Sequence, residues 1–515
     1  MFMSLRSPHP DPTCQPTEAP CRRQRRGCSL RSAILFGLIV LLLALQNRPE
    51  STLAAEPTDK PNIVYIMADD MGYGDPSCYN PASKCPTPNL DRLAREGMRF
   101  TDAHAPAGVC VPSRFGLLSG RFPYRMQKDK DGLCLPKDRL TVANLLQKAG
   151  YQTACIGKWH LGFTHEKEPG KLTLDGGPAS RGFDTYFGIP ASLDIPPYYY
   201  IEGKKAVEPP TDFIAASSSP NWSPIQGAFW REGKIAPGYR HREVLPKFIQ
   251  RSLGYLEGRA KKPKQPFFLY IALPAPHTPW LPTEPFEGVS QAALYGDFVT
   301  QVDASIGQVL QKLDQLNLTE NTIVMVSSDN GPCWYDVDEK KYQHYSAGPL
   351  RGMKGDAYEG GHRMPFLVRW PGTVKPGSVS EEIVCHTDLM ATVAEIVKMK
   401  LPKNAGGDSV SYLPALKGEV REQPLREALI ITCSKKTFAV RQGPWKLITN
   451  NLGSGGFTPP RYVEPEKDGP QGQLYHLATD LSETKNLYME HPEIVKKLEA
   501  ILKRYQEQED SVPRS

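Results

Sequence analysis

Three short apolar runs constrain the fold of this chain more than any other feature of its sequence. They cover residues 62–68, 267–273 and 322–328, are rich in β-branched or aromatic residues, and end in polar turns. Continuous apolar runs of this length are typical of strands that a sheet buries on both faces. Helical patterns at 88–100 and 141–149 lie between the first run and the second. This alternation predicts an α/β fold in which helices sandwich a large mixed sheet.

The pattern changes in two further regions. Residues 189–241 are rich in Pro, Tyr, Ser and Gly, and irregular segments of this length are usually functional, so we expect this region at the rim of a site. Near the C-terminus, short strands are predicted at 428–433, 437–441, 445–449 and 473–477, with a helix at 492–508. We therefore expect three parts: a leader at 1–55, a main domain at 56–415, and a smaller C-terminal α+β subdomain at 416–515.

The first 55 residues have the composition of an export signal. A basic run at 22–26 precedes an apolar stretch at 33–45, and small residues follow at 52–55. Thirteen apolar residues are short for a bilayer span of about 20 and fit the core of a signal peptide. The sequence thus predicts an exported protein in the periplasm, the extracellular space or another secretory compartment, without a stable membrane span once the signal is cleaved. A leader retained as an anchor is the alternative.

Net charge gives no support to nucleic-acid binding. The chain carries a formal +6, but the leader alone holds seven arginines against three acids. The remaining 460 residues are therefore close to neutral. A nucleic-acid-binding domain would be expected to show a strong basic excess.

Polar residues follow the first and third apolar runs directly. Asp69 and Asp70 come after the first run, and Asp329 and Asn330 after the third. The carboxyl ends of parallel strands meet at one edge of a sheet, where ligands bind. Carboxylate and amide oxygens without His or Cys among them suit a hard cation, Ca²⁺ or Mg²⁺, better than zinc.

Between these acids lie a cysteine motif and several basic groups. Cys110 stands in Cys-x-Pro-x-Arg, which ends at Arg114. Lys158 and His160 are two residues apart in Gly-Lys-Trp-His, and an extended segment would place them on one side. His277 follows the second apolar run, and Lys354 lies between glycines in Arg-Gly-Met-Lys-Gly.

Together these motifs resemble the type I sulfatases of the alkaline phosphatase superfamily, and in particular the arylsulfatases. The resemblance runs from Pro61 to about Pro371. It implies an alkaline phosphatase-like fold, and it implies that a formylglycine-generating enzyme oxidises Cys110 to formylglycine. It further implies a metal site, with Ca²⁺ or Mg²⁺ held by Asp69, Asp70, Cys110, Asp329 and Asn330.

The same resemblance implies a role for each remaining residue in the hydrolysis of a sulfate ester. The hydrated aldehyde at position 110 would attack sulfur while Asp329 accepts its proton. Arg114, Lys158 and Lys354 would offset the negative charge of the sulfate oxygens. His277 would protonate the departing alcohol, and His160 would act as the base that releases sulfate.

Two other functions stay open at this point. Phosphodiester and phosphonate monoester hydrolases of the same superfamily use a similar site. A non-catalytic, metal-dependent glycan-binding protein would keep the acids but would need no group to protonate a leaving alcohol. For a sulfatase, the substrate would be a sulfated small molecule or a sulfated carbohydrate, because the core chemistry does not select the alcohol.

Overall fold

The computed structural model describes residues 60–512 except 169–170, 224, 435 and 466. The predicted leader at 1–55 lies outside these residues. Among the residues described, no helix is long and apolar enough to cross a membrane.

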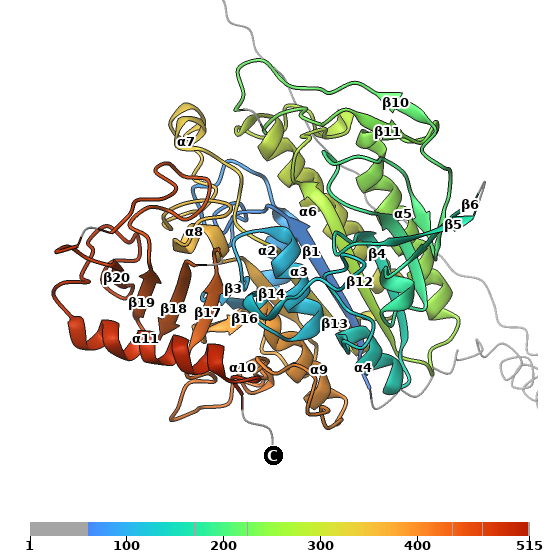
Figure 1. Ribbon diagram of the computed structural model, residues 1–515. Helices are drawn as coiled ribbons and strands as arrows, with labels where there is room; N and C mark the ends of the chain where they lie inside the picture. Colours follow the sequence, from blue (N-terminus) through green and yellow to red (C-terminus); the bar gives the residue numbers. More distant parts are fainter. Residues whose placement is uncertain (1–59, 169–170, 224, 435, 466, 513–515) are drawn as a thin grey trace, which may run out of the picture. The chain divides into compact units, whose positions relative to one another are not determined.

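A twelve-stranded sheet forms the centre of the protein (Figure 1). Its strands, in spatial order, are β15 (Ser378–Ser380), β2 (Met98–Phe100), β14 (Phe366–Arg369), β13 (Thr322–Ser328), β1 (Asn62–Asp69), β12 (Phe267–Pro276), β4 (Gln152–Lys158), β7 (Thr185–Ile189), β8 (Ile201–Glu202), β9 (Lys205–Ala206), β6 (Lys171–Asp175) and β5 (Thr164–Glu168). The five strands from β13 to β7 are parallel, and antiparallel strands β14 and β8 adjoin them on either side. The predicted mixed sheet is confirmed.

The three apolar runs are neighbours at the middle of this sheet. Val64 of β1 lies opposite Leu269 of β12 on one side and Val324 of β13 on the other. Every residue of these three strands is buried, which is why their sequences are mostly apolar and do not alternate between apolar and polar residues.

Helices cover the sheet in two groups. Helices α2 (Pro88–Glu96), α5 (Val244–Ala260) and α6 (Ala293–Gln315) contact one another and the strands β12 and β14. Helices α3 (Cys110–Ser119), α4 (Val142–Lys148) and α9 (Leu389–Ile396) form the second group, which contacts β4 (Figure 1). The shorter helices are α7 (Asp336–Tyr342), α8 (Glu359–His362) and α10 (Leu413–Leu416).

The helix expected at 88–100 is wrong in its last turn. Helix α2 ends at Glu96, and residues 98–100 form the strand β2. Phe100 pairs with Phe366 of β14, a partner more than 260 residues away that no local pattern reveals. Gly97 makes the change possible, because a Cβ there would lie 2.3 Å from the carbonyl oxygen of Val368.

The C-terminal region forms a second, smaller sheet, drawn in red-brown at the left of Figure 1. Its antiparallel strands are β17 (Leu429–Thr432), β18 (Phe438–Gln442), β19 (Trp445–Thr449) and β20 (Gly472–His476), within a residue or two of the predicted bounds. Helix α11 (Pro492–Glu507) buries Leu498, Ile501 and Leu502 in one apolar cluster with these strands.

The region 189–241 contains short strands and does not form one long loop. It includes β8, β9, β10 (Asp212–Ile214) and β11 (Gly233–Ile235), and the last two pair with each other. Its Gly227 carbonyl accepts hydrogen bonds from the Thr278 hydroxyl at 3.0 Å and the Trp280 amide at 2.8 Å. This region therefore packs beside the residues that follow β12.

Candidate active site

The four oxygen-bearing residues of the first and third apolar runs meet at the carboxyl ends of β1 and β13. Asn330 donates from Nδ2 to Asp70 Oδ1 at 2.6 Å, and the Asp70 amide donates to Asp329 Oδ1 at 3.3 Å. Asp69, Asp70, Asp329 and Asn330 are at most 2% exposed. Because β1 and β13 are parallel neighbours, residues 260 apart in sequence leave the sheet side by side.

Two oxygens of this group fit a bound cation. Among the described residues, Asp69 Oδ1 and Asn330 Oδ1 are buried and have no hydrogen-bond partner. A buried oxygen that accepts no hydrogen bond destabilises the folded state unless a ligand contacts it. The surrounding acids add two further carboxylates, so the donor set matches the predicted Ca²⁺ or Mg²⁺ site.

Two buried lysines lie directly on these acids. Lys158, at the end of β4, places Nζ 2.6 Å from Asp69 Oδ2. Lys354 places Nζ 2.7 Å from Asp70 Oδ2. Burial alone would raise the pKa of Asp69, but the charge of Lys158 holds it well below its usual range. The pKa of Lys354 is raised despite its burial, because Asp70 stabilises the ammonium. Lys354 is therefore charged.

Arg114 completes the positive groups. Its Nε donates to Asp329 Oδ2 at 2.9 Å, and Nη1 donates to the Lys158 carbonyl at 3.1 Å. The third guanidinium nitrogen, Nη2, lies 3.7 Å from Asp69 Oδ1. Three buried cations thus face three buried acids. A divalent cation would leave the site net positive, which suits an anionic substrate.

Cys110 occupies the first turn of α3, and its Sγ lies 3.3 Å from His160 Nδ1. Burial raises the pKa of the Cys110 thiol, so it is not a ready thiolate. Burial, together with the charge of Lys158, lowers the pKa of His160 well below its usual range and keeps the ring neutral. A neutral imidazole can accept a proton.

Lys158 and His160 do not share one side of an extended segment. The strand β4 ends at Lys158, and His160 has a φ of 60°. Their side chains consequently reach different partners, Asp69 and Cys110. The segment is thus not extended at His160, so the condition for a common side is not met, and both residues nevertheless join the site.

His277 follows β12 and lies between two carboxylates. Its Nε2 is 3.7 Å from Asp70 Oδ2, and its Nδ1 is 3.9 Å from Asp194 Oδ1. Asp194 belongs to the irregular region 189–241, and its Oδ1 is buried without a hydrogen-bond partner. Its other carboxylate oxygen pairs with Arg231, whose side chain is about half exposed. Sequence reasoning did not single out Asp194, because nothing local distinguishes it.

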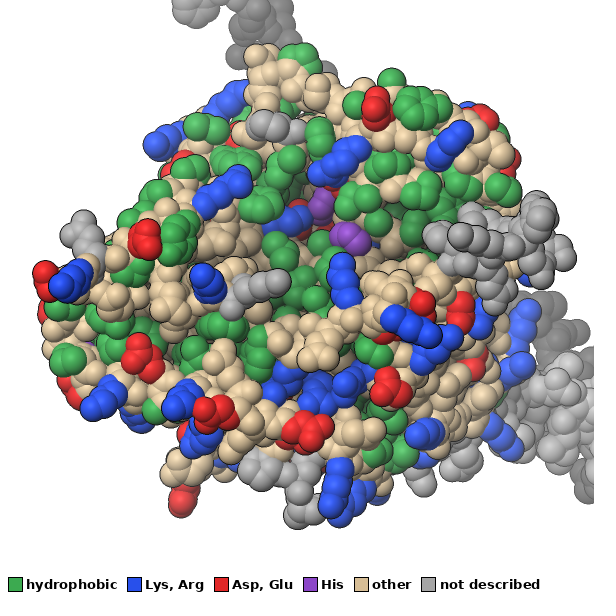
Figure 2. Space-filling model, viewed as in Figure 1, with side chains coloured by type: hydrophobic (Ala, Val, Ile, Leu, Met, Phe, Trp, Pro, Cys, Tyr) green, Lys and Arg blue, Asp and Glu red, His purple; other side chains and the backbone are tan. Residues whose placement is uncertain are grey.

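All the residues predicted from the sequence are therefore brought together at one edge of the sheet. In the space-filling view, histidine, acidic and basic side chains are visible in a hollow near the middle of one face (Figure 2). This hollow lies near the carboxyl ends of the central strands drawn in Figure 1.

Comparison with known protein families decides what this site belongs to. The sulfatase family model matches residues 61–399. The chain belongs to the sulfatase family. A model for the C-terminal part of N-sulphoglucosamine sulphohydrolase matches residues 354–508 of this sulfatase.

Characterised relatives agree with this assignment. An N-acetylgalactosamine-6-O-sulfatase of Bacteroides thetaiotaomicron is 34% identical over 502 residues, which cover 86% of this sulfatase and 93% of that protein. Human arylsulfatase A is 35% identical over 400 residues, covering 75% and 74%. The protein is thus a sulfuric ester hydrolase.

Solved structures agree at the level of the fold. A Bacteroides thetaiotaomicron sulfatase structure, from work on glycosaminoglycan metabolism, superimposes with a TM-score of 0.77 at 32% identity. It covers 88% of this chain and is itself covered completely. A phosphonate monoester hydrolase of Agrobacterium radiobacter, at 16% identity and a TM-score of 0.58, shares the fold alone. The sulfatase therefore has the alkaline phosphatase-like α/β fold that its sequence predicts.

Proposed function

We propose that this sulfatase hydrolyses the sulfate ester of a sulfated carbohydrate with a formylglycine made from Cys110. The observation that carries the proposal is the position of Cys110 on the first turn of α3. There its thiol contacts His160 and interacts electrostatically with Lys158 and Lys354. Burial raises the pKa of the Cys110 thiol, which argues against an unmodified thiolate as the nucleophile. A formylglycine-generating enzyme is the partner that this modification requires.

We assign the metal site to Asp69, Asp70, Asp329, Asn330 and the residue derived from Cys110. The orphaned oxygens of Asp69 and Asn330 support this assignment. When bound, Ca²⁺ or Mg²⁺ supplies Lewis-acid polarisation of the sulfate oxygens and lowers the pKa of the hydroxyl that attacks.

Arg114, Lys158 and Lys354 hold the sulfate and stabilise its charge. Each is at least 93% buried, where a fixed charge acts more strongly than it would in water. Arg114 also orients Asp329, the acceptor for the proton of the attacking hydroxyl. Two guanidinium nitrogens, Nε and Nη2, both contact Asp329 Oδ2, so Arg114 does not occupy the other oxygen, Oδ1.

The two histidines act at different stages. His277, with 7% of its surface exposed, protonates the leaving alcohol. Its Nδ1 donates to the Thr278 carbonyl at 2.6 Å, which holds the orientation of the ring, and Asp194 places a carboxylate oxygen 3.9 Å from the same nitrogen. His160, kept neutral beside Cys110, accepts the proton whose loss releases sulfate.

The substrate class rests on the relatives. Several of them are named as N-acetylgalactosamine-6-sulfatases, so a 6-sulfated N-acetylgalactosamine unit is the first compound to test. The predicted leader agrees with an exported enzyme, which would meet such glycans outside the cell or in a secretory compartment.

One experiment tests the central proposal. Mass spectrometry of the peptide around Cys110 should show an aldehyde in active protein, and specific activity with nitrophenyl sulfate should scale with that fraction. Cys110→Ala should fold and bind Ca²⁺ but be inactive. Robust activity from protein whose Cys110 is entirely thiol would overturn the proposal. Hydrolysis of a panel of defined sulfated sugars then identifies the alcohol.

A further inference from the structure

The segment 351–363 connects three parts of the active site through its backbone. The Lys354 amide donates to the Pro332 carbonyl at 2.9 Å. Pro332 directly follows residues 329–331, which carry the proposed metal ligands Asp329 and Asn330 and are called the metal-binding turn below. The Gly331 amide of that turn donates to the Gly361 carbonyl at 2.9 Å. The Gly355 amide donates to the Gly108 carbonyl at 2.6 Å, two residues before Cys110.

The backbone contacts are so close that no side chain larger than hydrogen fits at three of their glycines. A Cβ on Gly331 would lie 1.9 Å from the Gly360 carbonyl oxygen, and a Cβ on Gly361 would lie 2.2 Å from the Asp356 carbonyl oxygen. A Cβ on Gly108 would lie 2.9 Å from the carbonyl carbon of Gly355. In such close packing, a displacement of the segment moves Lys354, the metal-binding turn and the start of α3 together.

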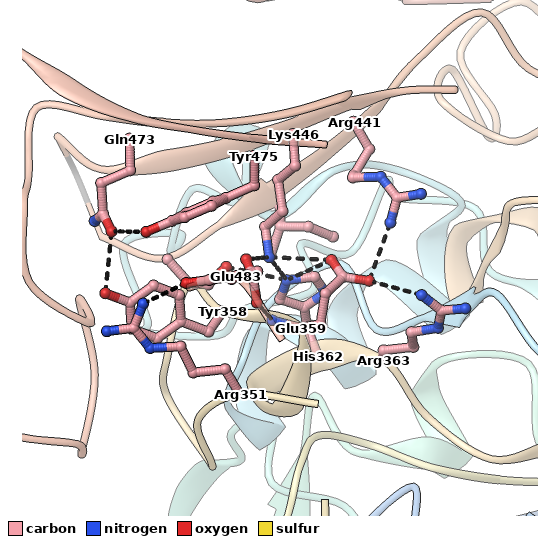
Figure 3. A network of polar contacts seen from close by, with 12 residues as sticks. Arg351, Tyr358, Glu359, His362, Arg363, Arg441, Lys446, Gln473, Tyr475 and Glu483 are labelled. Atoms are coloured by element: carbon pink, nitrogen blue, oxygen red, sulfur yellow. Dashed lines mark hydrogen bonds and ion pairs between the residues drawn. The ribbon is translucent and has the colours of Figure 1, made fainter. Parts of the chain in front are cut away.

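A buried charge network holds the segment from the opposite side (Figure 3). Glu359, fully buried at the start of α8, accepts from Lys446 Nζ of β19 at 3.0 Å. Its other oxygen accepts from Arg441 Nη1 of β18 at 3.0 Å. The Glu359 amide donates to Glu483 Oε2 at 2.6 Å, and Glu483 also pairs with Lys446 at 2.8 Å.

The cations that hold Glu359 thus come largely from the C-terminal sheet. Burial would raise the pKa of Glu359, but Lys446 and Arg441 hold it well below its usual range, so Glu359 is ionised. A buried, ionised carboxylate is held beside its cations, because moving away would leave its charge unpaired in the protein interior.

Resting on the proposed function, we propose that Glu359, Lys446 and Arg441 are positioning residues through which the C-terminal sheet sets the geometry of the metal-binding turn and of Lys354. None of them contacts the acids of the site. They act through the segment 351–363, whose backbone bonds end at Pro332, Gly331 and Gly108.

The test compares two buried ion pairs that both join the C-terminal region to the main domain. Glu359→Gln removes the charge held by Lys446 and Arg441. Arg426→Met breaks the Arg426–Asp388 pair, which is equally buried but does not touch the segment 351–363. Direct titration of Ca²⁺ into each full-length protein gives the dissociation constant, and hydrogen exchange follows the Gly331 and Gly355 amides.

Glu359→Gln should raise the Ca²⁺ dissociation constant about tenfold or more and accelerate exchange at both amides, as expected when a supporting shell is loosened. At saturating Ca²⁺ its kcat for nitrophenyl sulfate should still fall, because Lys354 is displaced. Arg426→Met should lower the unfolding temperature without changing Ca²⁺ affinity. If Glu359→Gln does not fold, Lys446→Met combined with Glu483→Gln removes one charge of each sign and should show the same changes.

Each outcome separates this inference from the proposed function. Wild-type affinity and exchange in Glu359→Gln, or an equal loss of affinity in Arg426→Met, would overturn the positioning role alone. A wild-type protein that binds no Ca²⁺ or Mg²⁺ would overturn the metal site, and the positioning role with it.

Discussion

Replacing Arg114 by methionine removes the charge that faces both Asp329 and Asp69. Arg114 is 1% exposed, so the carboxylate of Asp329 would be left buried without its closest cation. Breaking one buried ion pair costs about 3–5 kcal/mol. Loss of the hydrogen bond to the Lys158 carbonyl adds about 1 kcal/mol. Arg114→Met should therefore lower the free energy of unfolding by about 4–6 kcal/mol, or three to four powers of ten in the unfolding equilibrium.

The catalytic loss should be separable from the loss of stability. Removing one hydrogen-bond donor that stabilises the charge developing in the transition state lowers kcat about 10²–10³-fold. The assay is denaturant unfolding with and without Ca²⁺, alongside turnover of nitrophenyl sulfate. Ca²⁺ should recover part of the stability, because it neutralises Asp329, but should not recover turnover.

Arg369→Met is the matched control for this prediction. Arg369 is 2% exposed and pairs with Glu96 at 2.7 Å, but Glu96 reaches solvent. Its removal should cost about 1 kcal/mol and leave turnover unchanged. Turnover within tenfold of wild type in Arg114→Met, or an equal loss of turnover in Arg369→Met, would refute the assignment of Arg114 to the sulfate.

Three further predictions concern leaving groups, pH and metal. His277→Ala and Asp194→Asn should slow alkyl sulfates much more than nitrophenyl sulfate, whose oxygen leaves without a proton. Equal slowing of both esters would contradict the role of His277. Burial raises the pKa of Asp303 from the ordinary 3.8 to about 6, although it accepts hydrogen bonds from the first turn of α2. The folded protein then holds this proton more tightly than the unfolded chain, so stability should fall by up to about 3 kcal/mol between pH 4 and 6. Asp303→Asn should flatten that part of the stability curve, and an unchanged slope would show that another group titrates. Chelation should abolish turnover and Ca²⁺ or Mg²⁺ should restore it, whereas Asp329→Ala should regain no activity in either ion.

The central strands and the site residues on them could be predicted because their signals are local. A strand buried on both faces has a continuous apolar sequence, and β13 was predicted with its observed bounds. Asp69 ends such a strand, and Asp329 and His277 directly follow two others, so the predicted sheet already places them at one edge. The C-terminal helix carries its own apolar periodicity, and its start at Pro492 was predicted for the same reason.

What the sequence did not predict depends on partners distant along the chain. The strand β2 exists because β14 offers it an edge, while its own sequence also fits a helix. His160 has a positive φ, which residues with a Cβ usually avoid, so the sequence alone does not predict this conformation. Asp194 and Glu359 matter because they contact His277 and Lys446, and only the fold brings these pairs of residues together.

The burial of α3 has a consequence for how the protein is made. Arg114 and the Cys110 side chain are almost completely enclosed once the sheet has formed. If Cys110 is oxidised as proposed, the enzyme that does so needs an accessible chain, because the folded protein encloses the thiol. Conversion of Cys110 and folding would then compete during biosynthesis, and the one that came first would determine the fate of each molecule. A chain that folded early would keep its thiol inside a folded but inactive protein. The yield of working enzyme would then depend on the timing of synthesis, in addition to the stability of the fold.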